Sequence, residues 1–179
     1  PEKVLGTRAA WVNENPHSAR ALTAAVLEAA RWIDASDANR RETAAAIANR
    51  AYLNTKVETI EGRMLGDYDN GLGKQWKDSH PMRFFNEGAV SFPYLSDGMW
   101  FLTQFKRWGL LKQEPDYLAV AEAINRIDIY QQAASAVGNV ALPGSKMRSS
   151  TLIDGKVWNG TNPAEYAASF AIKRQGDQV

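Results

Sequence analysis

"PMRFFNEGAVSFPYLSDGMWFLTQFKRWG", residues 81–109, contains eight of the eighteen aromatic residues of this chain. Within a helix beginning at Ser96 or Asp97, Phe101, Phe105 and Trp108 recur at i, i+4 and i+7, which places them on one helical face. Such a face could be part of the core, a platform for a ligand, or a surface that meets a membrane.

The energetics of this stretch favour the core. Ordering twenty-nine residues costs conformational entropy, which aromatic burial offsets only if most of the rings leave water. A membrane-facing helix would carry basic residues along its polar face, but only Lys106 and Arg107 are present. Their place in the last helical turn is already explained by the helix dipole. We therefore expect a core, although one or two rings could still contact a ligand.

The signals on either side of this stretch predict a mostly α chain with a few short strands (α/β) and no linker that divides domains. Proline and glycine mark many of the expected boundaries. In chain order, the expected elements are a strand within 3–12, helices over 16–34, 38–52 and 55–64 (the last begun by a Thr55–Glu58 capping box), a loop over 66–81, a helix to Trp108 ended by Gly109, helices within 115–125 and 127–138, a two-residue hairpin at Asp154–Gly155, and a short helix after Asn162.

Composition excludes several classes of function. The chain of 179 residues has 21 Lys and Arg against 20 Asp and Glu, so it offers no general footprint for nucleic acid or an anionic membrane. It has no cysteine, which excludes disulfides and thiolate catalysis, and no apolar run of membrane-spanning length. Because it begins at Pro1, without methionine and in a strand-like stretch, we expect a fragment or processed product that lacks an N-terminal part.

The residues indicate neither a catalytic nor a metal centre. His17 and His80 have no partners at metal-ligand or catalytic-triad spacing, and no nucleophile motif surrounds a serine or lysine. We therefore expect no enzymatic activity, no metal and no cofactor.

One acidic loop comes close to a calcium site. In "DYDNGLGKQWKD" (67–78), Asp67, Asp69 and Asp78 occupy the first, third and twelfth positions of a calcium-binding loop. Gly71 replaces the fifth ligand, however, and Leu72 stands where the turn needs glycine. A solvated turn is the better interpretation.

Four segments together resemble a known family. "PEKVLGTRAAWVNENP", "FFNEGAVSFPYLSDGMWFLTQFKRWG", "DYLAVAEAINRIDIYQQAAS" and "MRSSTLIDGKVW" follow, in order, the C-terminal part of the nitrate- and bicarbonate-binding proteins of bacterial ABC importers. The resemblance extends from Pro1 to about Lys173. It implies the C-terminal portion of a two-lobed type II periplasmic binding protein: an inter-lobe strand over 1–12, a helical region of lobe 1 over 13–138, and a C-terminal extension with a hairpin over 139–179.

The resemblance also implies a ligand and partners. Lys3 matches a lysine that reaches the anion in nitrate-binding members, so we expect a small inorganic anion, nitrate or nitrite in preference to bicarbonate. Lysine is a point charge with three donors, which suits a partly buried oxyanion. The implied partner is an ABC permease subunit and the implied location the periplasm, without membrane insertion. Two alternatives remain: a cytoplasmic nitrate sensor of the same fold, and a regulatory domain fused to the transporter ATPase.

Overall fold

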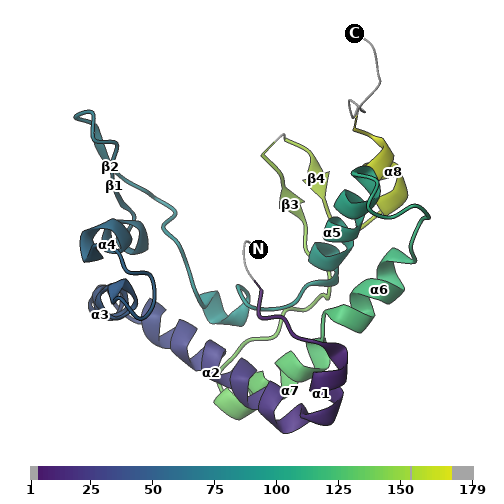
Figure 1. The fold of residues 1–179 in the computed structure, drawn as a ribbon, viewed down its shortest axis with the longest axis horizontal. Coiled ribbons are helices and arrows are strands. Elements are labelled where there is room, and N and C mark those ends of the chain that lie inside the picture. Colours follow the sequence, from purple (N-terminus) through teal and green to yellow (C-terminus); the bar gives the residue numbers. More distant parts are fainter. Residues whose placement is uncertain (1–3, 154, 171–179) are drawn as a thin grey trace. The chain divides into compact units, whose positions relative to one another are not determined.

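Residues 4–153 and 155–170 are described by the computed structural model of this chain, which is built mainly from α-helices (Figure 1). Two short antiparallel hairpins accompany the helices. The chain forms two compact units, each made from segments that are distant in sequence. The first unit contains the described residues up to Pro16, Phe92–Gln131 and those from Pro143 onward, and the second contains His17–Ser91 and Gln132–Leu142.

The first unit is organised around helix α5, which contacts α6 and α8 (Figure 1). An edge-to-face cluster of Phe92, Tyr94 and Tyr130 forms part of its core, with ring centroids 4.8 and 5.2 Å apart. Its elements are α1 (Ala9–Glu14), α5 (Leu95–Arg107), α6 (Tyr117–Ile124), the beginning of α7 (Ile127–Val137), β3 (Ser150–Thr151), β4 (Val157–Trp158) and α8 (Pro163–Ala168).

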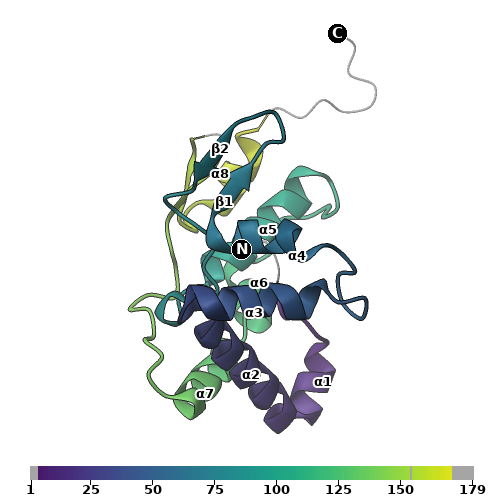
Figure 2. The ribbon, with the colours of Figure 1, turned by 90° about the vertical axis from the view of Figure 1, so that its left-hand side faces the viewer.

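The second unit contains two helices in close contact, α3 and α4, and a hairpin that extends from the end of α4 (Figure 2). Ser36 caps α3, since its side chain accepts a hydrogen bond from the Asn39 amide. Leu27 and Ala44 are fully buried. The elements are α2 (Pro16–Asp34), α3 (Asp37–Ala48), α4 (Val57–Leu65), β1 (Asp67–Asp69), β2 (Gln75–Lys77), the 3₁₀ turn η1 (Asn86–Gly88) and the end of α7.

Several predicted helix boundaries are confirmed. α2 begins at Pro16, and α8 begins at Pro163 after Asn162. Gly109 and Gly138 follow α5 and α7 with φ of +76° and +70°, the left-handed conformation that glycine adopts without steric cost. Proline and glycine act through their own backbone, so these boundaries are local properties of the sequence.

The strand expected near the start is not observed in residues 4–12. Residues 4–8 have no regular secondary structure, and α1 begins at Ala9. A strand needs a neighbour to complete its hydrogen bonds. In the described part of the chain, this segment has no neighbouring strand. Helix α1 instead forms backbone hydrogen bonds within its own segment. The assignment of residues to lobes remains a prediction.

Three local details also differ from the prediction. The expected loop over 66–81 contains a hairpin, in which Tyr68 pairs with Trp76 and their rings stack 5.4 Å apart. The capping box at Thr55 is not formed, since α4 begins after Lys56 without a side-chain cap. The second hairpin is present, but a Leu152–Lys156 hydrogen bond closes a loop longer than two residues; Asp154 lies outside the described residues.

The predicted core face of α5 is wrong, although other rings of the same stretch are buried. Phe101, Phe105 and Trp108 are 41%, 44% and 60% exposed. The buried face instead carries Leu95, Met99 and Leu102. These residues have the same i, i+4, i+7 spacing, so periodicity could not tell the two faces apart. Phe92 and Tyr94 are buried, and Phe84, Phe85 and Trp100 are half-buried.

Candidate functional site

The predicted anion-contacting residue, Lys3, lies outside the described residues. The described chain begins at Val4, and both Val4 and Leu5 are exposed. The anion contact of Lys3 therefore stays a prediction.

The acidic loop forms a self-contained turn. The Asp69 carboxylate accepts hydrogen bonds from the Gly71 amide at 2.7 Å and from the Gln75 side chain at 2.7 Å. These bonds hold the pKa of Asp69 below its usual value, the Gln75 bond being the larger cause. Asp67 forms an ion pair with Lys77 across the hairpin. The carboxylates thus stabilise the turn, and the described residues include no group of three His, Asp or Glu that could hold a metal ion.

Both histidines are exposed. His17 lies in the first turn of α2, and His80 follows the β1–β2 hairpin, where its amide donates to the Asp78 carboxylate. The structure does not bring the two histidines into a common site with each other.

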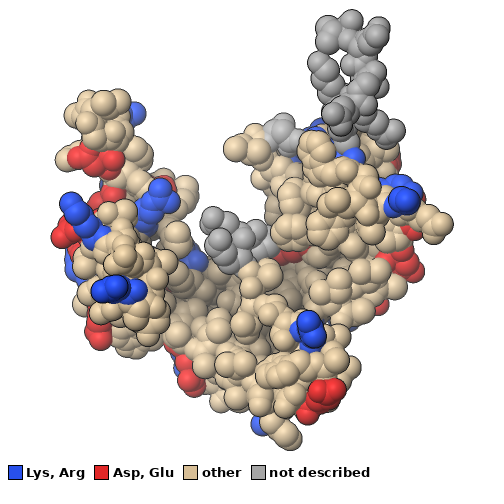
Figure 3. Space-filling model, in the orientation of Figure 1, with Lys and Arg blue, Asp and Glu red and all other residues tan. Residues whose placement is uncertain are grey.

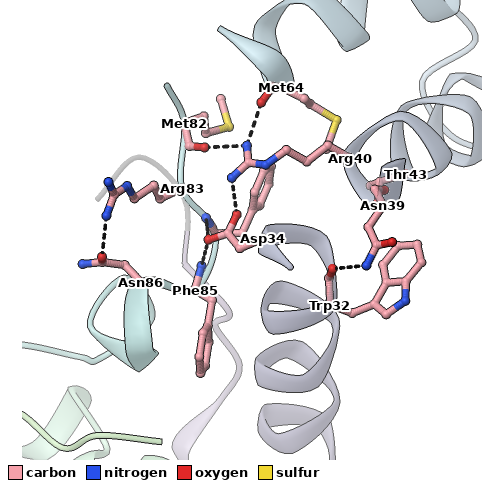
Figure 4. Close-up of polar contacts among 11 residues, drawn as sticks. Trp32, Asp34, Asn39, Arg40, Thr43, Met64, Met82, Arg83, Phe85 and Asn86 are labelled. Carbon is pink, nitrogen blue, oxygen red and sulfur yellow. Dashed lines mark hydrogen bonds and ion pairs between the residues drawn. The ribbon is translucent and has the colours of Figure 1, made fainter. Parts of the chain in front are cut away.

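The most extensive buried polar cluster in the second unit joins Asp34, at the end of α2, to Arg40 in α3 (Figure 4). The Arg40 guanidinium also donates to the carbonyls of Met64 and Met82, at 2.6 and 2.7 Å. The Asp34 carboxylate accepts hydrogen bonds from the backbone N–H groups of Phe84 and Phe85. Sequence separations of up to 51 residues hid this cluster from sequence analysis.

This cluster is a mostly buried ion pair whose carboxylate also accepts hydrogen bonds from two backbone amides. Two consecutive backbone N–H groups and a guanidinium converge on Asp34, which is the donor set that a buried anion needs. The side chains of Arg40 and Asp34 are only 11% and 16% exposed, and their charges compensate each other. The arrangement fastens segment 82–85 to the α2–α3 junction, which is a structural role.

A second cluster, in the first unit, holds the C-terminal hairpin against α5. The Arg148 guanidinium pairs with Asp97, with contacts of 2.8 and 2.9 Å. Ser96 is fully buried. Its hydroxyl accepts a hydrogen bond from the Arg148 amide, and its backbone carbonyl accepts one from the Trp158 indole N–H at 2.7 Å. Here too the donors and acceptors are paired within the protein, so the cluster orders a loop.

The shifted pKa of one tyrosine in the first unit is accounted for by packing. Burial, with the nearby Tyr94 as the smaller cause, raises the pKa of Tyr130 to about 12. Tyr130 belongs to the edge-to-face ring cluster of the first unit. Its phenol stays protonated at neutral pH, which suits a core residue better than a general base.

The surface is mixed in charge. On the face drawn in Figure 3, basic and acidic side chains are interspersed, without a broad area of one sign. In the described residues, no helix has both the length and the apolar character needed to cross a membrane. These observations agree with the near-equal numbers of basic and acidic residues in the sequence.

Comparisons with known proteins identify the class. The NMT1-like family matches residues 1–48. A crystal structure of the periplasmic nitrate-binding protein NrtA from Synechocystis PCC 6803 superposes with a TM-score of 0.81 and 33% identity, over 93% of this chain and 44% of that one. The fold is therefore that of part of a periplasmic binding protein, as the sequence predicted.

Curated relatives support the same family. The nitrate/nitrite binding protein NrtA of Synechococcus elongatus is 40% identical over 97% of this chain and 39% of its own length. The bicarbonate-binding protein CmpA of the same organism is 35% identical, over 97% and 41%. The nitrate import ATP-binding protein NrtC of Synechocystis is 33% identical, over 97% and 26%. Over almost all of its length, this chain is therefore similar to nitrate- and bicarbonate-binding proteins, and it spans about two fifths of the length of NrtA and CmpA.

Proposed function

We propose that this chain is part of the substrate-binding component of an ABC importer for nitrate or a similar small oxyanion. The observation that supports this most strongly is the similarity to nitrate/nitrite-binding NrtA, at 40% identity over 97% of the chain. The binding protein would be periplasmic, close its lobes around the anion, and deliver it to the permease subunit.

The proposed role is binding and not catalysis. The polar clusters of Asp34–Arg40 and Ser96–Arg148 are satisfied within the protein, and they position loops instead of presenting a nucleophile or a base. The relatives are named as binding proteins for nitrate, nitrite or bicarbonate. In this proposal the protein needs no cofactor.

Lys3 is the proposed anion-contacting residue of this chain, and its match to the lysine of nitrate-binding family members favours nitrate over bicarbonate. An ammonium group compensates the charge of a monovalent oxyanion and supplies three donors to its oxygens. This assignment rests on the family resemblance of "PEKVLG".

Titration calorimetry tests the proposal on the natural protein that contains this chain. Nitrate, nitrite, bicarbonate and sulfate are titrated in turn, and nitrate or nitrite is expected to bind. Heat with bicarbonate and none with nitrate would show that the ligand assignment is wrong. Lys3→Ala is expected to weaken nitrate binding, with Lys112→Ala, a change in the loop after α5, as a matched lysine control. Equal affinities in the two variants would remove Lys3 from the site.

A second candidate is a regulatory binding domain fused to the transporter ATPase, which the similarity to NrtC favours. The sequence upstream of this chain separates the candidates, because a nucleotide-binding domain there would support the second. An export signal would support the first, and neither feature would favour a cytoplasmic sensor.

A further inference from the structure

The tip of the β1–β2 hairpin carries an asparagine side chain next to a backbone amide that can attack it. Asn70 and Gly71 lie at this tip, and both are exposed. The Gly71 nitrogen is separated from the Asn70 Cγ by three atoms of the chain, so a bond between the two atoms closes a five-membered imide ring. Glycine has no side chain to obstruct this closure, and the space beside Gly71 is open.

The Gly71 amide, which is the nucleophile of such a closure, is hydrogen bonded to a carboxylate. It donates to Asp69 Oδ1 at 2.7 Å, a distance within the reach of a general base. The Gln75 side chain donates to the other oxygen, Oδ2, at 2.7 Å and fixes the orientation of the carboxylate. A nucleophile, its base and a group that orients the base are therefore joined by hydrogen bonds, as in sites that activate a weak nucleophile.

The side-chain carbonyl of Asn70, which is the electrophile, is polarised by two backbone amides. Its Oδ1 accepts hydrogen bonds from the Leu72 N–H at 2.8 Å and from the Lys74 N–H at 3.1 Å. Donors at these distances stabilise the negative charge that develops on a carbonyl oxygen when a nucleophile adds to its carbon. A backbone hydrogen bond from the Asn70 amide to the Lys74 carbonyl holds the turn that positions them.

We propose that the β1–β2 hairpin promotes the deamidation of its own Asn70, with Asp69 as the general base. The Asp69 carboxylate takes the proton of the Gly71 amide while the amide nitrogen bonds to the Asn70 Cγ. The bond from Cγ to Nδ2 then breaks, and the side-chain nitrogen leaves with a proton as ammonia. Water opens the imide at either carbonyl, which gives aspartate or isoaspartate at position 70. Both products add a carboxylate beside Asp69, and the isoaspartate also lengthens the main chain by one methylene group.

A second asparagine–glycine pair in the chain serves as an internal control. Asn159 Oδ1 also accepts two hydrogen bonds, from the amide and the hydroxyl of Thr161. Gly160, however, is packed, since a Cβ at this position would lie 3.2 Å from the Met147 sulfur. Such packing restricts the backbone rotation that imide closure requires. We therefore expect folding to slow the deamidation of Asn159 and to accelerate that of Asn70.

Peptide mapping by mass spectrometry tests this inference on the natural protein that contains this chain. Folded protein and guanidinium-unfolded protein are incubated side by side at mildly alkaline pH, and the conversion of Asn70 and Asn159 is followed with time. A general base typically accelerates a reaction about 100- to 10,000-fold. Because a carboxylate is a weak base, we expect less, about tenfold faster conversion of Asn70 in the folded protein than in the unfolded one.

Two variants separate the base from the shape of the turn. Asp69→Asn keeps an acceptor for the Gly71 amide but removes the base, and should slow the conversion of Asn70 in the folded protein about tenfold. Asp67→Asn, the matched control, changes the exposed pair with Lys77 in the same hairpin and should leave the rate unchanged.

Three results would overturn the inference. The first is conversion of Asn70 that is no faster in the folded protein than in the unfolded one, which needs no variant to observe. The second is an equal acceleration of Asn159 by folding, because the effect would then belong to any ordered asparagine–glycine pair. The third is an unchanged rate in Asp69→Asn, which would remove the carboxylate from the reaction.

Discussion

Replacing Asp34 by alanine tests whether the buried cluster of the second unit holds its loops in place. The carboxylate pairs with Arg40 and accepts the amides of Phe84 and Phe85, at 2.9 and 2.8 Å. Asp34→Ala removes all three contacts together. It leaves a guanidinium that is 11% exposed without its counter-ion, and two N–H groups without their acceptor.

The expected loss of stability follows from this geometry. Removing one partner of a buried ion pair costs about 3–5 kcal/mol. Because water reaches part of the Asp34 side chain, which is 16% exposed, we expect the lower end, about 3 kcal/mol. With a urea dependence of about 2 kcal/mol/M, the unfolding midpoint would fall by about 1.5 M. Asp34→Asn keeps an acceptor for the amides and is expected to cost less.

Urea unfolding of the natural protein, followed by circular dichroism, measures the global effect. Hydrogen exchange of the Phe84 and Phe85 amides measures the local one, because these N–H groups lose their acceptor. Asp67→Ala is the matched control, since Asp67 belongs to the exposed pair with Lys77. Exposed pairs contribute about 0–1 kcal/mol. If Asp34→Ala shifts the midpoint no more than Asp67→Ala does, or leaves both amides protected, the cluster does not hold segment 82–85.

Three further predictions concern the first unit. Trp158→Phe removes the indole hydrogen bond to the Ser96 carbonyl and should lower the free energy of unfolding by about 1–2 kcal/mol; an unchanged urea midpoint would contradict this. Gly98→Ala would place a methyl group 2.6 Å from the side chain of Asn125, between α6 and α7, and should lower the free energy of unfolding by about 1–3 kcal/mol in a thermal melt. Gly144 lies in open space, so Gly144→Ala should leave the midpoint of the same melt unchanged. Because folding raises the pKa of Tyr130, its contribution to stability is fully present below pH 10, the ordinary pKa of tyrosine, and is lost as the pH rises to about 12. Tyr130→Phe should therefore flatten the decline in the free energy of unfolding over this pH range.

Sequence analysis predicted the helices best where a helix boundary depends on the backbone conformation of a single residue. Pro16 begins α2 and Gly138 ends α7 as expected, because proline and glycine restrict or extend backbone angles wherever they occur. The similarity to nitrate- and bicarbonate-binding proteins was also predicted from the sequence, since the order and spacing of motifs are properties of the chain. The anion contact of Lys3 came from that resemblance and remains a prediction.

Tertiary contacts decided what periodicity and propensity left open. The Asp34–Arg40 cluster joins segments about fifty residues apart, and no local pattern indicates which backbone amides a carboxylate will meet. The stretch 4–8 had strand-like residues but forms no strand, because a strand depends on a neighbour that the sequence of the strand does not specify.

The aromatic stretch of 81–109 shows the division most clearly. By itself, the sequence determined that α5 forms, that it ends before Gly109, and that Phe101, Phe105 and Trp108 share one face. Only the tertiary structure decided that α6 and α8 leave this face exposed while Met99 and Leu102 are buried. The physical reason is that helical periodicity relates residues to their own axis, whereas burial depends on which neighbouring element packs against each side.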